Sequence, residues 1–311
     1  SLGKRNDLIC ASIEHKMGIH GSPTAVMSFG ENEGAVGYRI GEPNKGVGYM
    51  FTMMNHARVN VGLEGVGIAE RAYQHALWYA RERVQGAPIG DKSGVKKPIL
   101  HHPDVRRMLL HMKAYSEGLR VLVYYASYCM DRARMSQSKE ESQEWERRTA
   151  FLTPVAKAYG AEKGFRVAQT AMQVYGGYGY MKDYPVEQFL RDVKFITIGE
   201  GTTGIQALDL ASRKLLQESE TLLKGLLEDI SKFCKENKIH RTLAREMDIL
   251  ETAKEAASIW CSRCVCARNR CELRALLPSC SAVAILRTSI GRWHSCSLTT
   301  PAMAATCCPE I

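Results

Sequence analysis

The feature that most constrains the fold is a long run of apolar residues at helical spacing between Tyr49 and Arg83. No proline interrupts this run, and its apolar members are mostly three or four positions apart (Met50, Met53, Met54, Ala57, Val61, Leu63, Ile68, Ala72, Ala76 and Leu77). This period is typical of an amphipathic helix. We therefore predict one long helix over this segment, longer than most helices of globular domains.

Further helices are predicted downstream. They cover Pro103–Ser136, Glu144–Val174, Thr202–Glu218 and residues 221–259. Proline suits the first turn of a helix, as at Pro103, whereas Pro154 inside the third segment marks a kink or a local start. Long amphipathic helices joined by short loops bury their apolar faces against one another. The sequence therefore predicts a mainly α fold with an up-down helical bundle.

Residues 1–48 differ from this helical part. Apolar and polar residues alternate in T-A-V-M-S-F and again in A-V-G-Y-R-I, and a polar E-N-E-G stretch separates the two. Alternation with period two is the pattern of a half-buried strand. We predict two strands joined by this turn, as a partial β-domain ahead of the bundle.

The segment from Arg191 to Gln206 holds the most chemically suggestive residues. It places Glu200 between Gly199 and Gly201, after a run of β-branched and aromatic residues. Flanking glycines let a ligand approach the backbone closely. A carboxylate in an apolar pocket has its pKa raised and becomes suited to taking a proton from carbon. The alternative interpretation is that Glu200 only caps the helix that begins near Thr202.

Five motifs follow one another in the order found in the acyl-CoA dehydrogenase family. They are K-M-G-I-H-G-S-P-T, N-H-A-R, Y-A-R-E-R-V-Q-G, Q-V-Y-G-G-Y-G-Y and E-G-T-T-G-I-Q. The chain resembles this family from about Ser1 to Leu216. Within the family it is most similar to a bacterial branch with an extra C-terminal segment, which includes the 3-methylmercaptopropionyl-CoA dehydrogenases. The resemblance implies the C-terminal helical bundle of such an enzyme, preceded by part of its middle β-domain.

The resemblance also implies a reaction and a set of site residues. The reaction is α,β-dehydrogenation of an acyl-CoA thioester, with Glu200 as the base that removes the α-proton and FAD as the hydride acceptor. The residues implied for FAD are Arg83, Gln173, Gly176, Gly177, Thr202, Thr203 and Gly204, and those implied for the substrate are Asn55, Arg58 and Gly201. The implied partners are an electron-transferring flavoprotein and further copies of the chain, in a homodimer or homotetramer.

Three positions depart from the family pattern or admit a second interpretation. Gly199 stands where the family usually has an aromatic residue, which would enlarge the pocket or loosen Glu200. The family's R-x-x-F-G reads R-V-Q-G here, so Arg83 either reaches the cofactor pyrophosphate of a neighbouring subunit or is a solvated arginine at a helix end. Arg58 either faces the substrate or is a structural ion-pair partner.

The C-terminal part changes composition. Eight of the eleven cysteines follow residue 260, together with several arginines and no lysine. A zinc module needs a second C-x2-C pair that is missing, and a disulfide scaffold does not suit a chain that is otherwise poor in cysteine. We prefer a disordered or out-of-frame tail over 260–311, after a bundle at 49–218 and a helical extension at 219–259. Because Ser1 begins inside a polar stretch, we also expect an N-terminally truncated chain.

Other functional classes are weighed against the dehydrogenase. The net charge of +9 is too dispersed to favour nucleic acid, the histidines lack the paired spacing of metal ligands, and no apolar run approaches the roughly 20 residues of a membrane helix. We predict a cytoplasmic enzyme without metal. An acyl-CoA oxidase, an alkylation-response flavoprotein that associates with nucleic acid, and an inactive fragment are the alternatives.

Overall fold

The computed structural model describes residues 3–218, 220–240 and 242–269. The chain divides into two compact units, Ser1–Lys214 and Leu215–Ile311. Within the described residues no helix is both long and apolar enough to cross a membrane.

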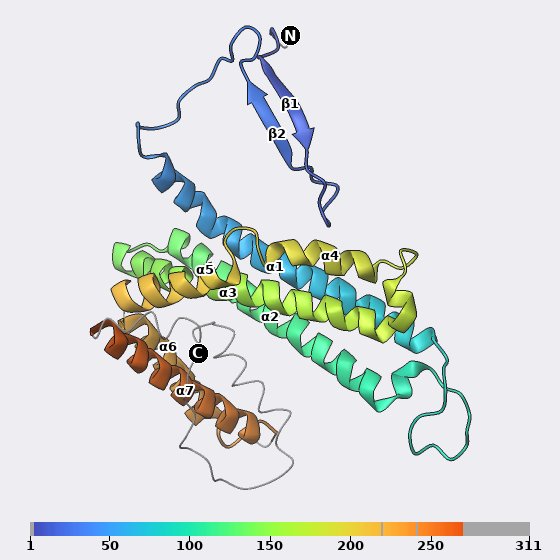
Figure 1. Ribbon diagram of the computed structural model, residues 1–311. Coiled ribbons are helices and arrows are strands. Elements are labelled where there is room, and N and C mark those ends of the chain that lie inside the picture. The colour runs from blue at the N-terminus through green and yellow to red at the C-terminus, as the bar shows by residue number, and fades with distance from the viewer. Residues whose placement is uncertain (1–2, 219, 241, 270–311) are drawn as a thin grey trace, which may run out of the picture. The chain divides into compact units, whose positions relative to one another are not determined.

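The first unit begins with a β-hairpin (Figure 1). Strand β1 (Leu8–Ile13) pairs antiparallel with β2 (Ala25–Phe29), and the register is irregular between Cys10 and Ser12. The strand predicted in T-A-V-M-S-F is thus confirmed, but the prediction of a second strand in A-V-G-Y-R-I is wrong. The partner of β2 lies upstream instead, because strand pairing is a tertiary choice that alternation alone does not specify.

The loop between the two strands contacts the helical part of the unit. The Ile19 amide donates to Oδ1 of Asp192 at 2.7 Å, and Nη1 of Arg191 donates to the Met17 carbonyl at 2.8 Å. Gly18 lies between these two bonds, where an added Cβ would come within 2.5 Å of Asp192 Oδ1. Side-chain and backbone hydrogen bonds therefore fix the loop against helix α4 (Val186–Ile196).

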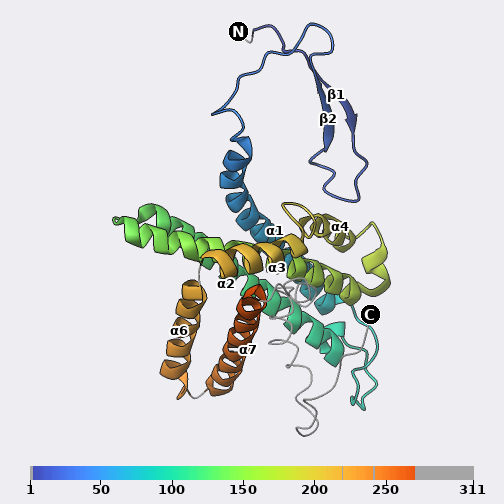
Figure 2. The same ribbon diagram turned by 60° about the vertical axis from the view of Figure 1, so that its left-hand side comes forward.

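Three long helices form the bundle: α1 (Gly46–Glu82), α2 (Pro103–Met135) and α3 (Lys139–Tyr175). Each packs against the other two (Figure 2). A short 3₁₀ turn, η1 (Ile99–His101), precedes α2. The predicted helices are confirmed, although α3 starts earlier than expected because the hydroxyl of Ser138 caps it by accepting from the Glu141 amide. Helix α3 also continues through Pro154, so this proline is not a local start.

Glycines allow α1 and α3 to approach until their backbones touch. A Cβ added at Gly65 would lie 2.3 Å from the Gly160 carbonyl oxygen, and one at Gly164 would lie 3.0 Å from the Gly65 carbonyl oxygen. Gly62 meets the Ala156 carbonyl oxygen at 3.0 Å in the same way. Residues with side chains would force the two helices apart, so this contact fixes how α1 and α3 pack.

The chain leaves α3 through a 3₁₀ turn, η2 (Gly176–Tyr180), and then forms α4. Gly176 has φ +60° and ends α3, which confirms that the glycine cluster terminates this helix. Helix α4 was not expected from the sequence. It buries Val186, Val193 and Ile196 against the bundle.

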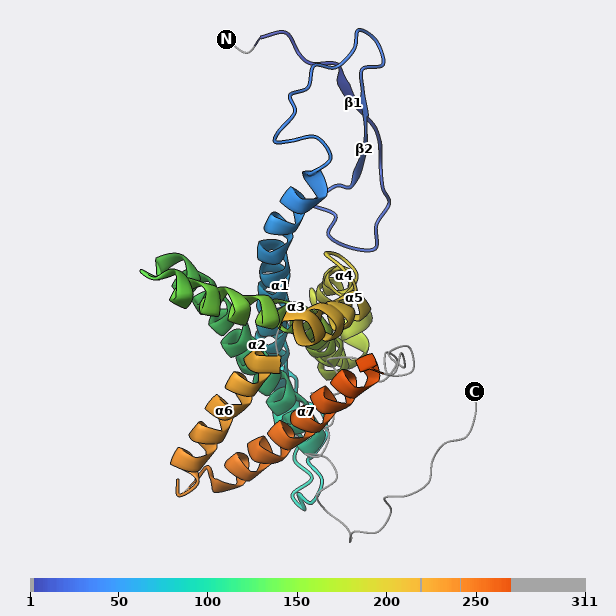
Figure 3. The ribbon, with the colours of Figure 1, turned by 90° about the vertical axis from the view of Figure 1, so that its left-hand side faces the viewer.

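After α4 the chain turns and enters α5 (Thr203–Leu208), which continues as a π-helical segment, η3 (Asp209–Glu218). The predicted helix over Thr202–Glu218 is therefore present, with a change of helical type. In the second unit, α6 (Glu220–Asn237) and α7 (Ala244–Asn269) lie side by side (Figure 3).

The single helix predicted over residues 221–259 is wrong, because the chain turns between α6 and α7. Nζ of Lys254 on α7 donates to the Ser231 hydroxyl on α6 at 3.0 Å. Helix α7 also includes residues 260–269, the start of the predicted tail. The rest of that prediction, over 270–311, lies outside the described residues.

We expect the α1–α3 contact to be sensitive to a single methyl group. Gly65→Ala should destabilise the chain by about 1–3 kcal/mol, the usual cost of overpacking a tight site. Gly67→Ala, two residues away with open space around its Cβ position, should instead stabilise it by about 0.4–1 kcal/mol through the unfolded state. Urea unfolding of both variants measures the difference, and equal effects would contradict the close contact.

Candidate functional site

Glu200 lies on a tight turn, residues 197–201, between α4 and α5. The amides of Ile198 and Gly199 both donate to the Phe195 carbonyl, at 2.9 and 2.8 Å. Glu200 itself has φ +55° and Gly201 has φ +91°. Left-handed backbone at a residue other than glycine is uncommon and persists only where its surroundings hold it. The turn therefore projects Glu200 at a conformational cost that other contacts must offset.

Two buried side chains supply those contacts. Nζ of Lys157 on α3 donates to the carbonyls of Ile196, at 2.9 Å, and of Gly201, at 2.6 Å. Nε2 of Gln206 on α5 donates to the carbonyls of Glu200, at 3.2 Å, and of Gly201, at 3.1 Å. Both side chains are fully buried. A Cβ at Gly201 would lie 2.8 Å from Gln206 Nε2, so glycine is required there for space as well as for its φ angle.

The capping interpretation of Glu200 is wrong. Helix α5 is capped by Thr202, whose hydroxyl accepts from the Ile205 amide at 3.3 Å. Within the described residues, neither a hydrogen bond nor an ion pair holds the Glu200 carboxylate. Glu200 is half-buried, and its carboxylate remains available to another group.

Glu64 and Lys157 interact electrostatically with this carboxylate, and Lys157 also interacts with Arg58 and Glu162. We call the linked set the charge cluster: Arg58, Glu64, Lys157, Glu162, Glu200 and Asp209. Although Glu64 of α1 is exposed overall, desolvation raises the pKa of its carboxyl, and repulsion by Glu200 raises it further. Burial lowers the pKa of Lys157 to about 8, together with repulsion by Arg58, while Glu200 and Glu162 act in the opposite direction.

Arg58 forms a buried ion pair inside this cluster. Its Nη1 lies 2.9 Å from Oδ2 of Asp209, and both side chains are less than a tenth exposed. This contact matches the ion-pair interpretation of Arg58. Its Nε is buried without a hydrogen-bond partner among the described residues, which leaves one donor for a ligand. Asn55, one turn earlier on α1, is exposed, and substrate contact by either residue stays a prediction.

The space next to Gly199 is filled by another aromatic ring. A Cβ added at Gly199 would lie 2.7 Å from the tip of the Phe195 ring. Phe195 is the last aromatic residue of α4 and is half exposed. An aromatic side chain at position 199 would therefore collide with Phe195 unless that ring moved. The effect of Gly199 on the pocket stays a prediction.

The cofactor residues predicted from the resemblance divide into two groups. The first lies where α1 ends and η2 begins: the Arg83 guanidinium stacks over the Tyr178 ring at 5.3 Å, next to the exposed Gln173, Gly176 and Gly177. The second group follows the Glu200 turn and contains Thr202, Thr203 and Gly204. The two groups stand at opposite ends of α4, which is roughly 16 Å long at 1.5 Å per residue.

The first group fits a bound anion. Nε of Arg83 is buried and has no hydrogen-bond partner among the described residues, so this guanidinium is not saturated by the protein as a purely structural arginine would be. In the second group, both hydroxyls already have hydrogen-bond partners within the protein. The Thr202 hydroxyl caps α5, and the Thr203 hydroxyl donates to Glu162 at 2.8 Å. Gly204 has open space where a Cβ would stand, apart from an ordinary contact with Thr202.

The predictions from sequence missed Lys157 and Gln206, which the fold brings to the Glu200 turn. For Lys157 the signal was its place in the apolar stretch T-P-V-A-K-A-Y-G. A lysine is seldom fully buried unless its ammonium has partners, so a lysine there indicates a buried polar contact. Two tyrosines of this region also make ring contacts: Tyr178 carries the Arg83 guanidinium, and Tyr175 stacks on Tyr79 at 4.1 Å.

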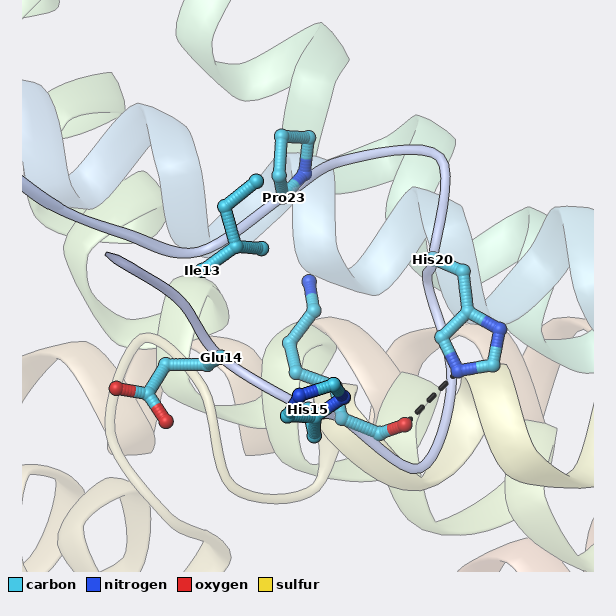
Figure 4. A pocket seen from close by; sticks show the side chains of 6 residues that line it. Ile13, Glu14, His15, His20 and Pro23 are labelled. Atoms are coloured by element: carbon cyan, nitrogen blue, oxygen red, sulfur yellow. Dashed lines mark hydrogen bonds between the residues drawn. The ribbon is translucent and has the colours of Figure 1, made fainter. Parts of the chain in front are cut away.

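A separate shallow pocket of about 220 Å³ lies on the loop that joins β1 and β2 (Figure 4). It is lined by Ile13, Glu14, His15, Lys16, His20 and Pro23. Nε2 of His20 is 2.8 Å from the Lys16 carbonyl, so the loop closes on itself. No residue of the Glu200 turn lines this pocket. Within the described part of the chain, no group of three or more His, Cys, Asp and Glu residues could hold a metal ion.

Comparison with known proteins assigns the chain to a family. The family model described as "Acyl-CoA dehydrogenase, C-terminal domain" matches residues 44–215, more than half of the chain. The chain therefore belongs to the acyl-CoA dehydrogenase family, and the fold class predicted from the sequence is confirmed.

Two curated relatives illustrate the match. The chain is 44% identical over 228 residues to 3-methylmercaptopropionyl-CoA dehydrogenase of Ruegeria pomeroyi, covering 73% of this chain and 38% of that protein. It is 37% identical over 258 residues to a butyryl-CoA dehydrogenase of Syntrophomonas wolfei, covering 81% and 42%. The chain thus spans about two fifths of the length of these relatives.

Solved structures agree. Butyryl-CoA dehydrogenase from Megasphaera elsdenii matches with a TM-score of 0.54 and 30% identity, over 65% of this chain and 47% of that one. Caenorhabditis elegans ACDH-11 in complex with C11-CoA matches with a TM-score of 0.76 over 91% of this chain and 46% of that one. At 21% identity, the second match shows the fold alone.

Removal of the acidic partner of Arg58 should be costly. Asp209→Ala leaves a buried guanidinium without its counter-charge, and we expect a loss of about 3–5 kcal/mol in unfolding free energy. Arg213→Ala is the matched control, because Arg213 is a half-exposed second partner of the same carboxylate at 3.1 Å, and exposed pairs contribute less than about 1 kcal/mol. Chemical denaturation compares the two, and an equally small effect of Asp209→Ala would contradict the structural role of the pair.

Proposed function

We propose that the protein catalyses α,β-dehydrogenation of an acyl-CoA thioester, with Glu200 as the base that removes the α-proton. The observation that supports this most strongly is the state of Glu200 in the fold. Its carboxylate is projected by a left-handed turn, lacks a partner among the described residues and is half-buried in a charge cluster. A carboxylate that is held in place by its backbone and left free at its side chain suits general base catalysis.

The other residues of the turn serve orientation. With Gly201 after Glu200, no Cβ stands between the backbone and a bound thioester. Arg58 keeps a free Nε on the same side of the fold as Lys157 and Glu200, which suits it to a polar group of the substrate. Asn55 on the exposed part of α1 is proposed to contact the CoA portion.

FAD is the proposed cofactor, and when bound it supplies an acceptor for the hydride that leaves the β-carbon. Arg83 would hold its pyrophosphate through charge-assisted hydrogen bonds, which its unpartnered Nε allows. Gln173, Gly176 and Gly177 lie beside Arg83 and would contact the same end of the cofactor. Thr202, Thr203 and Gly204 would contact a cofactor at the other end of α4. We propose that the two groups serve different FAD molecules in a homodimer or homotetramer, with Arg83 reaching the cofactor of a neighbouring subunit.

The substrate and partners are inferred by chemical class. The names of the relatives, 3-methylmercaptopropionyl-CoA and butyryl-CoA dehydrogenase, favour a short acyl group. A structure titled as an electron transferring flavoprotein of Acidaminococcus fermentans also matches this fold, at 28% identity and a TM-score of 0.56. We propose an electron-transferring flavoprotein as the electron acceptor, and a cytoplasmic location stays a prediction.

Glu200→Gln tests the assignment of the base. The chain spans only 38% of its relative 3-methylmercaptopropionyl-CoA dehydrogenase. The test therefore uses a fusion protein, in which this chain replaces the matching part of that relative and the rest of the relative is kept. Reduction of the flavin by butyryl-CoA is measured in this fusion. We expect Glu200→Gln to retain FAD and lose at least about a hundredfold in rate, the scale of a lost general base.

Glu64→Gln is the matched control, since Glu64 is the carboxylate of α1 that interacts electrostatically with Glu200. It should keep the rate within about tenfold, because a group that is not the base contributes no proton transfer. A hundredfold loss in Glu64→Gln together with near-normal turnover in Glu200→Gln would assign the base to Glu64 instead.

A further inference from the structure

Lys157 is an unusual residue to find in the centre of a helical bundle. Its side chain is fully buried on α3, one turn after the buried Thr153. No carboxylate within the described residues forms an ion pair with it, and its ammonium donates only to main-chain carbonyls. A buried ammonium that lacks a counter-charge costs several kcal/mol relative to an apolar side chain of similar size. Packing alone therefore does not account for a lysine here.

The two carbonyls that accept from Lys157 stand at the two ends of the Glu200 turn. Ile196 is the last residue of α4, and its carbonyl is one of those left without a helical partner at a helix C-terminus. Gly201 directly follows Glu200, and its carbonyl lies 2.6 Å from Nζ. One ammonium on α3 thus connects the entry and the exit of the turn, and a cation also suits the negative end of the α4 dipole.

Gln206 alone does not make this connection. Its amide donates to the carbonyls of Glu200 and Gly201, both on the exit side of the turn. Loss of Lys157 would therefore remove the hydrogen bond that connects the Ile196 carbonyl, at the start of the turn, to helix α3. The left-handed backbone at Glu200 would then lose one of the contacts that offset its cost.

Lys157 also has charged neighbours. The electrostatic neighbours of the ammonium are Arg58 of α1, Glu162 of α3 and Glu200, and those of the Glu200 carboxylate are Lys157 and Glu64 of α1. The ammonium is thus close enough to the Glu200 carboxylate for the two charges to interact, while Arg58 is paired with Asp209.

We propose that Lys157 is a positioning residue for Glu200: its ammonium donates to the carbonyls at both ends of the turn and so holds the backbone that carries the carboxylate. This inference rests on the proposed function of Glu200 as the base. Lys157 does not contact the substrate in this role, and acts only through the turn.

Lys157→Met removes the charge and both hydrogen bonds with little change in length. Thr153→Val is the matched control, because it removes a buried hydroxyl of α3 that bonds only within its own helix, to the Thr149 carbonyl at 2.8 Å. In the chain itself, amide hydrogen exchange should accelerate at least about tenfold over residues 197–202 in Lys157→Met and stay unchanged there in Thr153→Val. If Lys157→Met does not fold, Lys157→Gln, which keeps an N–H donor but no charge, takes its place.

The second readout is the split between kcat and KM in the fusion described above. It is measured below pH 7, where the wild-type Lys157 is still mostly protonated, since its pKa is about 8. Loss of the two hydrogen bonds to the turn should lower kcat more than it changes KM, because a displaced base affects the chemical step more than substrate binding. Thr153→Val should leave both unchanged.

The outcomes separate the two proposals. Faster exchange at the turn with an unchanged kcat would overturn the positioning role if Glu200→Gln loses its rate, and would trace the failure to the assignment of the base if Glu200→Gln keeps its rate. Unchanged exchange over residues 197–202 in the charge-free variants would overturn the positioning role of Lys157. The same result in Thr153→Val as in Lys157→Met would overturn it too, because general loosening of α3 would then explain both.

Discussion

The close approach of α1 and α3 is the constraint on which the candidate site depends. Glycines at positions 62 and 65 of α1 and 160 and 164 of α3 let the two backbones touch. On the same two helices, Arg58 and Lys157 are thereby brought close enough to repel each other and to share the neighbourhood of Glu200. Wider spacing would separate Arg58 of α1 from the turn that α3 supports. Because close-packed helices leave little free volume, a small change in their spacing would also shift the side chains that they carry.

The turn after α4 shows how the fold accommodates an unfavourable local conformation. A left-handed glutamate costs roughly 1–3 kcal/mol, and a buried ammonium without a counter-charge costs more. The hydrogen bonds between them offset part of both costs, because the ammonium needs acceptors and the turn offers two carbonyls to it. The result is a carboxylate whose backbone is fixed and whose side chain is free. The Arg83 group lies at the other end of α4, and in the proposed function it serves the cofactor of a neighbouring subunit.

The sequence predicted the helices that have long apolar periods and missed the features set by tertiary contacts. Helices α1 and α2 followed from periodicity, whereas the start of α3 at the Ser138 cap lies in S-K-E-E, ahead of the predicted start at Glu144. The short α4 was hidden by its β-branched residues, which pack against the bundle. Glu200 was identified by its motif, and the roles of residues such as Asn55 and Gly177 stay predictions. Lys157 could not be assigned from local pattern, because its acceptors lie about forty residues away in sequence.

The central claim, that this fold aims Glu200 at the α-carbon of an acyl thioester, is tested most directly by a crystal structure of the fusion with FAD and an acyl-CoA analogue that cannot be oxidised. The account predicts a carboxylate oxygen of Glu200 within about 3–3.5 Å of the α-carbon, the separation of a near-attack geometry. A complex in which Glu200 points away from the thioester, with Glu64 or another group beside the α-carbon, would contradict it.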